Sequence, residues 1–285
     1  MQSQVIVALD GSTEAEAILP HALFIALQTQ SVLTLLRVIM PPDEPGYGAQ
    51  YIPDDWYAGE VSWTKNYLAG LATRLQGQGA RVHIQHVEGT FAGAAINSYA
   101  AQHAGVQLIA LATHGRSAGG RLLLGSVAGD VLASAPTSLL LLHPPNDRQL
   151  PPGPITQASY QTIVVPLDGM VGSERVLQQA TRLALASHAS LLLVADPPPP
   201  LHDQQVRAQE EMKEADFLAD RAEQVRSSTG LTVQTAFTKG DPEAFIERLQ
   251  GQYRQQLLIV TLRQQAEHKV MSFLHQSTVP VLFVA

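Results

Sequence analysis

The segment VIVALDGSTEAEAILPHALFIALQ, residues 5–28, aligns without a gap with IVVPLDGMVGSERVLQQATRLALA, residues 163–186. Asp10 falls on Asp168 and Glu16 on Glu174, each 158 positions apart. Each copy has the pattern of an apolar strand, a turn that contains Asp-Gly, and a helix with apolar residues at helical spacing. Because the turn and the helix face match in register, we interpret the two segments as an internal duplication.

Further strands and helices follow in the same order in both copies. The predicted pairs are strands 32–39 and 190–195, helices 58–77 and 204–228, strands 81–89 and 231–240, helices 90–102 and 241–252, strands 106–112 and 256–262, and strands 137–143 and 279–285. Strands that alternate with helices and are apolar along their length predict a parallel sheet covered on both faces. The sequence therefore predicts an α/β protein with two tandem, doubly wound, five-stranded domains, residues 1–145 and 160–285, joined by a proline-rich linker, residues 146–159.

Composition limits the classes of partner. The chain has 285 residues, a formal net charge of −7 and no cysteine. A net negative charge argues against nucleic acid or an anionic membrane as the main partner, and the absence of cysteine excludes disulfides and thiolate chemistry. The N-terminal residues show no signal-peptide pattern, and no apolar run reaches transmembrane length, so we expect a cytoplasmic protein.

A glycine-rich loop follows the fourth strand of the first copy, in LATHGRSAGGRLLLGSVAGDV, residues 111–131. Ligands of such sheets bind at the carboxyl ends of the strands, where both Asp10 and this loop are expected. Glycines ahead of a helix start expose backbone N–H groups and the positive end of the helix dipole. Arg116, Arg121 and the Ser126 hydroxyl add positive charge and a donor, so the loop predicts a phosphate site.

Other kinds of site fit the sequence less well. The P-loop pattern is absent, and no Gly-x-Gly-x-x-Gly follows the first strand. Ser126 does not lie in the nucleophile pattern Gly-x-Ser-x-Gly, so we predict no catalytic residue. His83 and His86 are three apart on a predicted strand and face opposite sides, so we predict no metal site.

The loop spacing resembles that of the universal stress protein family. Its nucleotide-binding members carry Gly-x-x-Gly, nine residues, and then Gly-Ser or Gly-Thr. Here Gly115 is followed by nine residues and then Gly125-Ser126, although Ala112 replaces the first glycine. The Asp-Gly-Ser turn at residues 10–12 also fits the family. The chain thus resembles a tandem two-domain member, with a Rossmann-like, adenine nucleotide α-hydrolase-like fold.

The resemblance implies ATP, with or without Mg²⁺, as the ligand of the first domain. The implied contact residues are Ala8, Leu9, Asp10, Val38, Ala112, Thr113, His114, Gly115, Arg116, Gly125, Ser126 and Val127. Among them, Asp10 would bind adenine or ribose and Val38 would line the adenine pocket. Ala112 and Gly115 would contact ribose and α-phosphate, and Gly125 and Ser126 would bind the β- and γ-phosphates. Two alternatives stay open: Asp10 as a turn residue that caps the first helix, and the glycines as turn formers only.

The second copy lacks this loop. Its connection between the fourth and fifth strands is eight residues shorter, and RQQAEHKVMSFL, residues 263–274, contains no glycine. Glu267 would repel phosphate, so we expect one nucleotide per chain, in the first domain. Asp168 is then a structural turn residue.

Three functions remain compatible with the sequence. The first is a stress-related regulatory module that binds ATP without turnover. The second is a slow Mg²⁺-dependent ATPase, for which the loop offers His114 as a base. The third is an interaction protein with a vestigial pocket, which Ala112 would fit. The apolar last strands, residues 138–143 and 280–285, predict an intramolecular pseudo-dimer in which they pair, and a further homodimer stays open.

Overall fold

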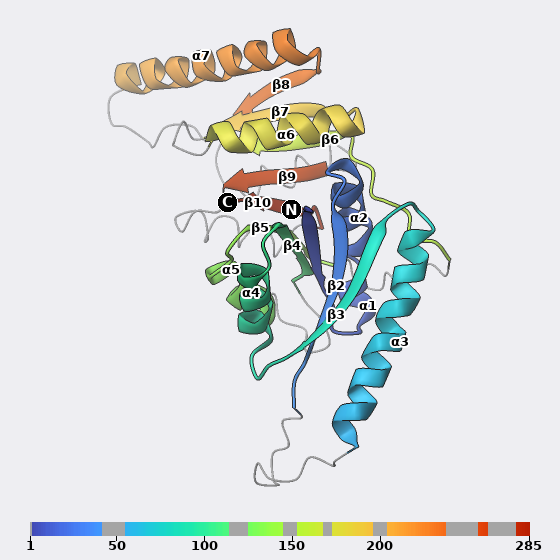
Figure 1. The fold of residues 1–285 in the computed structure, drawn as a ribbon. Coiled ribbons are helices and arrows are strands. Elements are labelled where there is room, and N and C mark those ends of the chain that lie inside the picture. The colour runs from blue at the N-terminus through green and yellow to red at the C-terminus, as the bar shows by residue number, and fades with distance from the viewer. Residues whose placement is uncertain are drawn as a thin grey trace. The chain divides into compact units, whose positions relative to one another are not determined.

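The computed structural model describes residues 2–41, 55–113, 125–144, 153–167, 173–195, 204–237, 256–261 and 278–285. The chain divides into two compact units, Met1–Ala158 and Ser159–Ala285. Each unit contains its own parallel sheet with helices packed on it (Figure 1).

The first unit is a five-stranded parallel sheet. Its strands are β1 (Gln4–Ala8), β2 (Val32–Ile39), β3 (Arg81–Glu88), β4 (Val106–Ala112) and β5 (Ser138–Leu142). They are arranged in the order β3-β2-β1-β4-β5. The chain builds outward from β1 to β3 and then returns to β4. The strand order therefore reverses between β1 and β4, where ligands of such folds bind.

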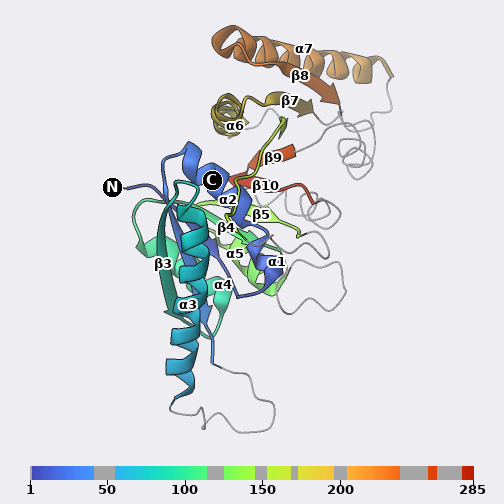
Figure 2. The ribbon, with the colours of Figure 1, turned by 90° about the vertical axis from the view of Figure 1, so that its right-hand side faces the viewer.

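Among the described residues of the first unit, five helices accompany these strands. They are α1 (Thr13–Glu16), α2 (Leu19–Gln28), α3 (Trp56–Gln76), α4 (Ala92–Gln102) and α5 (Ser126–Ala133). Neighbouring residues of β2 show how the helices are distributed. Arg37 Nη1 donates to Glu60 Oε2 of α3 at 2.9 Å, whereas Val38 lies beside Gly89, at the end of β3 that leads into α4. Because successive side chains of a strand point to opposite faces, α3 covers one face and α4 the other (Figures 1 and 2).

The predicted first helix is interrupted. The sequence pattern favours one helix after the Asp-Gly turn, but α1 ends at Glu16 and α2 begins at Leu19. Pro20 lies in the first turn of α2. Proline has no N–H to donate and fits only the first turn of a helix, so the chain starts a new helix there.

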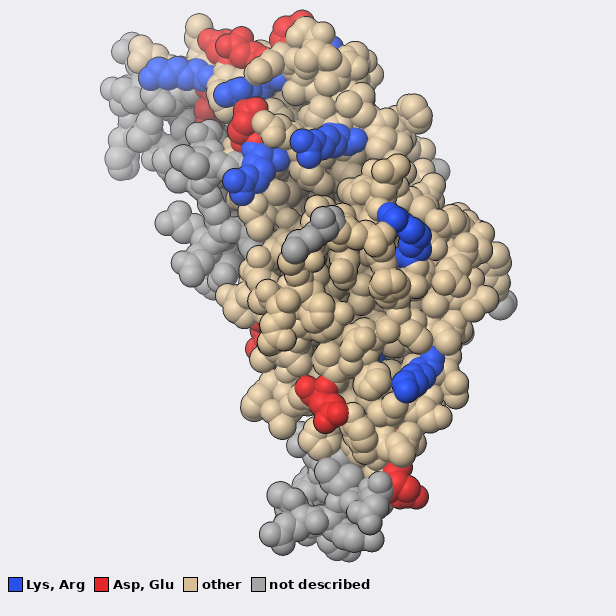
Figure 3. All heavy atoms as spheres, in the orientation of Figure 1, with Lys and Arg blue, Asp and Glu red and all other residues tan. Residues whose placement is uncertain are grey.

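Burial follows the predicted pattern. Every side chain of β2 except Val38 is buried, as expected for a strand covered on both faces. The edge strand β3 is largely exposed, and its side chains are mostly polar. On the face shown in Figure 3, most of the Lys and Arg side chains of the described residues lie in the upper part of the view, interspersed with Asp and Glu.

The second unit repeats the topology of the first. Its strands are β6 (Thr162–Pro166), β7 (Ser190–Ala195), β8 (Val233–Phe237), β9 (Gln256–Thr261) and β10 (Val281–Val284), with helices α6 (Ser173–Ser187) and α7 (Gln204–Thr229). The order β10-β9-β6-β7-β8 corresponds to β5-β4-β1-β2-β3. All pairs are parallel, so the predicted fold class of two tandem doubly wound domains is confirmed. The helix predicted over residues 241–252 lies outside the described residues.

Some predictions about domain organisation stay predictions. The described part of the proposed linker is bonded to the first unit, since Ala158 N donates to Pro20 O at 2.8 Å and Arg74 Nε to Gly153 O at 2.7 Å. The domain boundaries and the pairing of the two last strands remain predictions. Within the described ranges, no helix combines the length and the apolar character needed to cross a bilayer.

Candidate functional site

The floor of the candidate site is the carboxyl end of β1. Leu9 N donates to Leu36 O at 2.9 Å, so pairing with β2 continues one residue beyond the strand. Ala8 and Leu9 are 9% and 4% exposed. Their side chains belong to the core, so only their backbone groups could reach a ligand.

Asp10 lies in a tight turn between β1 and α1. Gly11 has φ of +89°, a conformation that favours glycine. Ser12 N and Ser12 Oγ both donate to Asp10 Oδ1, at 2.9 and 2.5 Å, and Ser12 Oγ accepts from Ala15 N at 3.1 Å. Ser12, not Asp10, is therefore the cap of α1. The turn orients the Asp10 carboxylate at the carboxyl end of β1.

Val38 forms the neighbouring wall. In the β1–β2 register Ala8 is level with Leu36, which places Asp10 at the level of Val38. A Cβ on Gly89 would lie 3.6 Å from Val38 Cγ1 and 3.0 Å from Ala95 Cβ. The end of β3 and the start of α4 therefore meet at Val38, which is the partly exposed residue of an otherwise buried strand.

The other wall is the connection from β4 to α5. Ala112 ends β4, and the next residue, Thr113, is 2% exposed. Thr113 N donates to Leu142 O at 2.8 Å, and Thr113 O accepts from Gly125 N at 2.8 Å. Thr113 Oγ1 is hydrogen-bonded to His143 Nδ1 at 3.2 Å. The start of α5 is thus tied to the carboxyl ends of β4 and β5.

Three of the predicted contact residues lie in the loop between these points. They are His114, Gly115 and Arg116, and like Arg121 they fall outside the described residues. The structure brings the remaining predicted residues to one end of the sheet, on β1, β2, β4 and α5.

Within the described residues, the start of α5 has no side-chain cap. Gly125 is its N-cap, with φ −56° and ψ 147°, and no described side chain closes this end by a hydrogen bond. The backbone bond from Gly129 N to Gly125 O, 2.9 Å, marks the first helical turn. The N–H groups of Ser126 and Val127 precede it and point out of the helix start, where the dipole is positive. This end of α5 has the chemistry of an anion site.

Helix α4 fixes the position of α5. A Cβ on Gly93 would lie 2.4 Å from Asp130 Cβ and 3.2 Å from Val127 O, so the two helices approach closely there. Asn97 Nδ2 donates to Val131 O at 3.2 Å and to Ser134 Oγ at 2.9 Å, at the far end of α5. The position of the N-terminal end of α5 is therefore fixed by contacts along the helix.

Sequence reasoning missed several of these supporting residues. The Thr113–His143 contact joins positions 30 apart, and no local pattern announces it. Gly93 does carry a signal, because a glycine inside a helix often marks close packing. Among the described side chains, no cluster of three or more His, Cys, Asp or Glu could hold a metal ion.

Comparisons with known proteins show the same fold. A universal stress protein from Archaeoglobus fulgidus DSM 4304 is 15% identical, with a TM-score of 0.67 over 99% of this chain and 95% of that chain. A candidate universal stress protein from Pseudomonas aeruginosa UCBPP-PA14 is 17% identical, with a TM-score of 0.65 over 99% of this chain and 93% of that chain. None of the curated protein sequences matches the chain.

The family comparison covers both halves. The model of the universal stress protein family matches residues 1–143 and again residues 159–285. The resemblance noted in the sequence and the duplication are both confirmed by these two matches. The chain belongs to the universal stress protein family and is a tandem, two-domain member of it.

Proposed function

We propose that the first domain binds one adenine nucleotide, ATP with or without Mg²⁺, and that the protein acts as a stress-related regulatory binding module in the cytoplasm. The observation that carries this proposal is the start of α5. It begins at Gly125 without a side-chain cap, and it is fixed to the carboxyl end of β4 through Thr113. A rigid, uncapped helix start is suited to phosphate.

The described residues fit such a nucleotide. The N–H groups of Ser126 and Val127 and the Ser126 hydroxyl would donate to the β- and γ-phosphates. Val38 would contact the adenine ring, and Asp10, held by its turn, would accept a hydrogen bond from adenine or ribose. Ala112 would lie beside the ribose or α-phosphate. His114, Gly115 and Arg116 complete the proposed set from the loop between β4 and α5.

Binding without rapid turnover is the function that these residues support best. Hydrolysis requires a base that orients the attacking water. Among the described residues, His143 lies at the carboxyl end of β5, and its Nδ1 is bonded to the hydroxyl of Thr113. His114, the base that the sequence offers, lies outside the described residues. Any Mg²⁺ would accompany the phosphates, where it neutralises charge.

The nucleotide released from the denatured protein tests the proposal directly. We expect one adenine nucleotide per chain after purification, or one ATP site per chain by isothermal titration of the emptied protein. A phosphate-release assay with Mg²⁺ should show little turnover. Two sites per chain would contradict the restriction to the first domain, and no adenine nucleotide by either measurement would favour an interaction protein with a vestigial pocket.

A further inference from the structure

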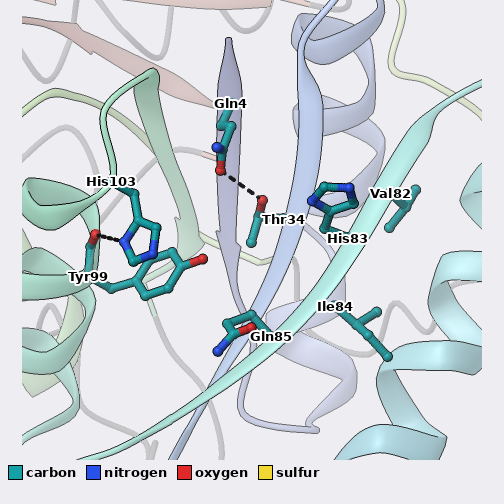
Figure 4. Close-up of a pocket in the computed structure, with 8 residues that line it drawn as sticks. All are labelled: Gln4, Thr34, Val82, His83, Ile84, Gln85, Tyr99 and His103. Atoms are coloured by element: carbon teal, nitrogen blue, oxygen red, sulfur yellow. Dashed lines mark hydrogen bonds between the residues drawn. The ribbon is translucent and has the colours of Figure 1, made fainter. Parts of the chain in front are cut away.

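A polar depression of about 420 Å³ lies on the sheet of the first unit. It lies away from the proposed nucleotide site at the carboxyl ends of β1, β2 and β4, hereafter the crevice. Figure 4 shows the residues that line it, on β1, β2, β3 and α4. They are Gln4, Thr34, Val82, His83, Ile84, Gln85, Tyr99 and His103. Its volume falls within the range of about 300–1,000 Å³ that small-molecule sites occupy.

The depression and the crevice are at opposite ends of the strands. Gln4 is the first residue of β1, and Thr34 and His83 lie opposite each other near the starts of β2 and β3. The crevice, in contrast, follows the last residues of β1, β2 and β4. The two places share no residue, so the second does not depend on the proposed nucleotide site.

The depression exists because α4 leaves part of the sheet uncovered. α4 packs on β2 and β4, whereas β3 is the edge strand, and its His83 and Gln85 are exposed. Figure 4 shows these two side chains on the side of β3 that faces Gln4 and Thr34. Tyr99 and His103, from the end of α4, form the opposite wall.

Internal hydrogen bonds orient the two glutamines. Thr34 is 2% exposed, and its Oγ1 donates to Gln4 Oε1 at 3.3 Å. Since the amide oxygen of Gln4 is the acceptor, its Nε2 is the end that offers donors. Gln85 Nε2 donates to His86 O at 2.9 Å, so its Oε1 offers an acceptor. Both amides therefore have defined roles before any ligand arrives.

The aromatic wall is oriented in the same way. His103 Nδ1 lies 2.7 Å from Tyr99 O, and the two rings stack with centroids 3.9 Å apart. A carbonyl oxygen only accepts, so Nδ1 carries the hydrogen, and Nε2 of the neutral ring is an acceptor. Burial raises the pKa of Tyr99, so its phenol keeps its proton and can donate.

We propose that this depression binds an uncharged sugar ring, either a monosaccharide or the ribose of a nucleoside. Its wall combines donors from Gln4 and Tyr99 with acceptors from Gln85 and His103. None of the eight lining residues is Asp, Glu, Lys or Arg, so the wall offers no carboxylate, ammonium or guanidinium group that could pair with a charged ligand. A hydroxyl group donates and accepts at once, and a ring that carries several of them matches such a wall.

Titration of the ¹⁵N-labelled protein followed by NMR tests the proposal, with D-ribose and adenosine as separate probes. The side-chain amides of Gln4 and Gln85 report on the depression, and the backbone amide of Val38 reports on the crevice. We expect saturable shifts at the two glutamine amides. A response to D-ribose identifies the sugar ring as sufficient, and a response to adenosine alone identifies a nucleoside. In the adenosine titration, a shift at the Val38 amide identifies binding at the crevice, and shifts at the two glutamine amides identify binding at the depression.

Two variants in the wall and one control outside it make the result specific. Tyr99→Phe removes one hydroxyl and should weaken binding about fivefold, the usual net effect of a single hydrogen bond. His83→Ala should also weaken it, whereas His86→Ala, a change on the same strand but outside the lining residues, should not. The proposal is overturned if neither probe shifts the glutamine amides at millimolar concentration. It is equally overturned if the shifts appear but Tyr99→Phe and His83→Ala both behave like the parent, since that marks adventitious binding only.

Discussion

Helices α1 and α5 start at the same end of the same sheet, yet their first turns differ. Helix α1 is capped by Ser12, whose Oγ accepts from Ala15 N at 3.1 Å. Helix α5 starts at Gly125, and no described side chain caps it. In the first case a side chain of the protein accepts from one of the N–H groups of the first turn, whereas in the second no described side chain does. Under the proposed function, the N–H groups at the start of α5 donate to phosphate instead.

The largest effect should come from a substitution that blocks the uncapped start of α5. Gly125→Val should abolish ATP binding, because a branched side chain would occupy the space where phosphate meets the backbone. Losing two hydrogen bonds to a charged group, at about 1.5–3 kcal/mol each, corresponds to a loss of at least about a hundredfold. The φ of −56° and ψ of 147° at Gly125 suit any residue, so the variant should fold. Isothermal titration with ATP measures the loss.

The second domain supplies the matched control. Gln265→Val changes the corresponding connection, which lacks the glycine loop and lies outside the described residues. ATP affinity should be unchanged. If Gln265→Val lost affinity or Gly125→Val retained it, the assignment of the nucleotide to the first domain would be wrong.

The position of the start of α5 depends on a glycine in α4. Gly93→Ala would place a Cβ 2.4 Å from Asp130 Cβ, which is close to the backbone of α5 and cannot swing aside. Helix α5 must therefore shift. Overpacking of this kind costs about 1–3 kcal/mol of stability, and a shifted α5 should weaken ATP binding about tenfold. Urea unfolding and titration with ATP measure the two effects.

Gly70→Ala is the control for this substitution. Gly70 lies within α3, and a Cβ there would meet nothing within 4 Å. The change should raise the free energy of unfolding by up to about 1 kcal/mol through helix propensity, with no change in ATP affinity. If Gly93→Ala proved as harmless as Gly70→Ala, α4 would not determine the position of α5.

The sequence was sufficient to predict the framework of the sheet. Strands β2 and β4 occupy the predicted residues because each is a continuous apolar run bounded by turns. The duplication predicted the order of the second sheet from that of the first. The break between α1 and α2 was not predicted, although Pro20 was its local signal.

The candidate site could be predicted only in part. The carboxyl ends of parallel strands lie at the same end of the sheet. Asp10, Val38 and Gly125 therefore come to that end, and this follows from the strand assignments. The contacts that hold the site do not follow from any local pattern. The Gly93–Asp130 approach and the Thr113–His143 bond join segments that are far apart in sequence and meet only after packing.

A smaller effect is expected from removing the cap of α1. Ser12→Ala removes the cap of α1 and the bond from Ser12 Oγ to Asp10 Oδ1, whereas the bond from the backbone N of residue 12 to Asp10 Oδ1 remains. The loss of an N-cap costs about 1 kcal/mol, which urea unfolding would detect. Thr13→Ala, at an exposed neighbour, is the control and should leave stability nearly unchanged. A stability as high as that of the parent in Ser12→Ala would show that the α1 cap contributes nothing.

The smallest effect concerns Ala112, where the family pattern has glycine. Ala112 ends β4 and is level with Leu142 of β5, so its backbone position is fixed by the sheet. If its methyl group crowds the ribose or α-phosphate, Ala112→Gly should tighten ATP binding a few-fold. Tripolyphosphate lacks the sugar, so it should bind both proteins equally if the methyl group crowds the ribose, and it should bind Ala112→Gly more tightly if the methyl group crowds the α-phosphate. A glycine in a strand also costs about 0.5–1 kcal/mol of stability, which sets the size of the structural side effect.

A marked loss of ATP affinity in Ala112→Gly would mean that the methyl group contacts the nucleotide favourably, and that this chain has adapted its site to alanine.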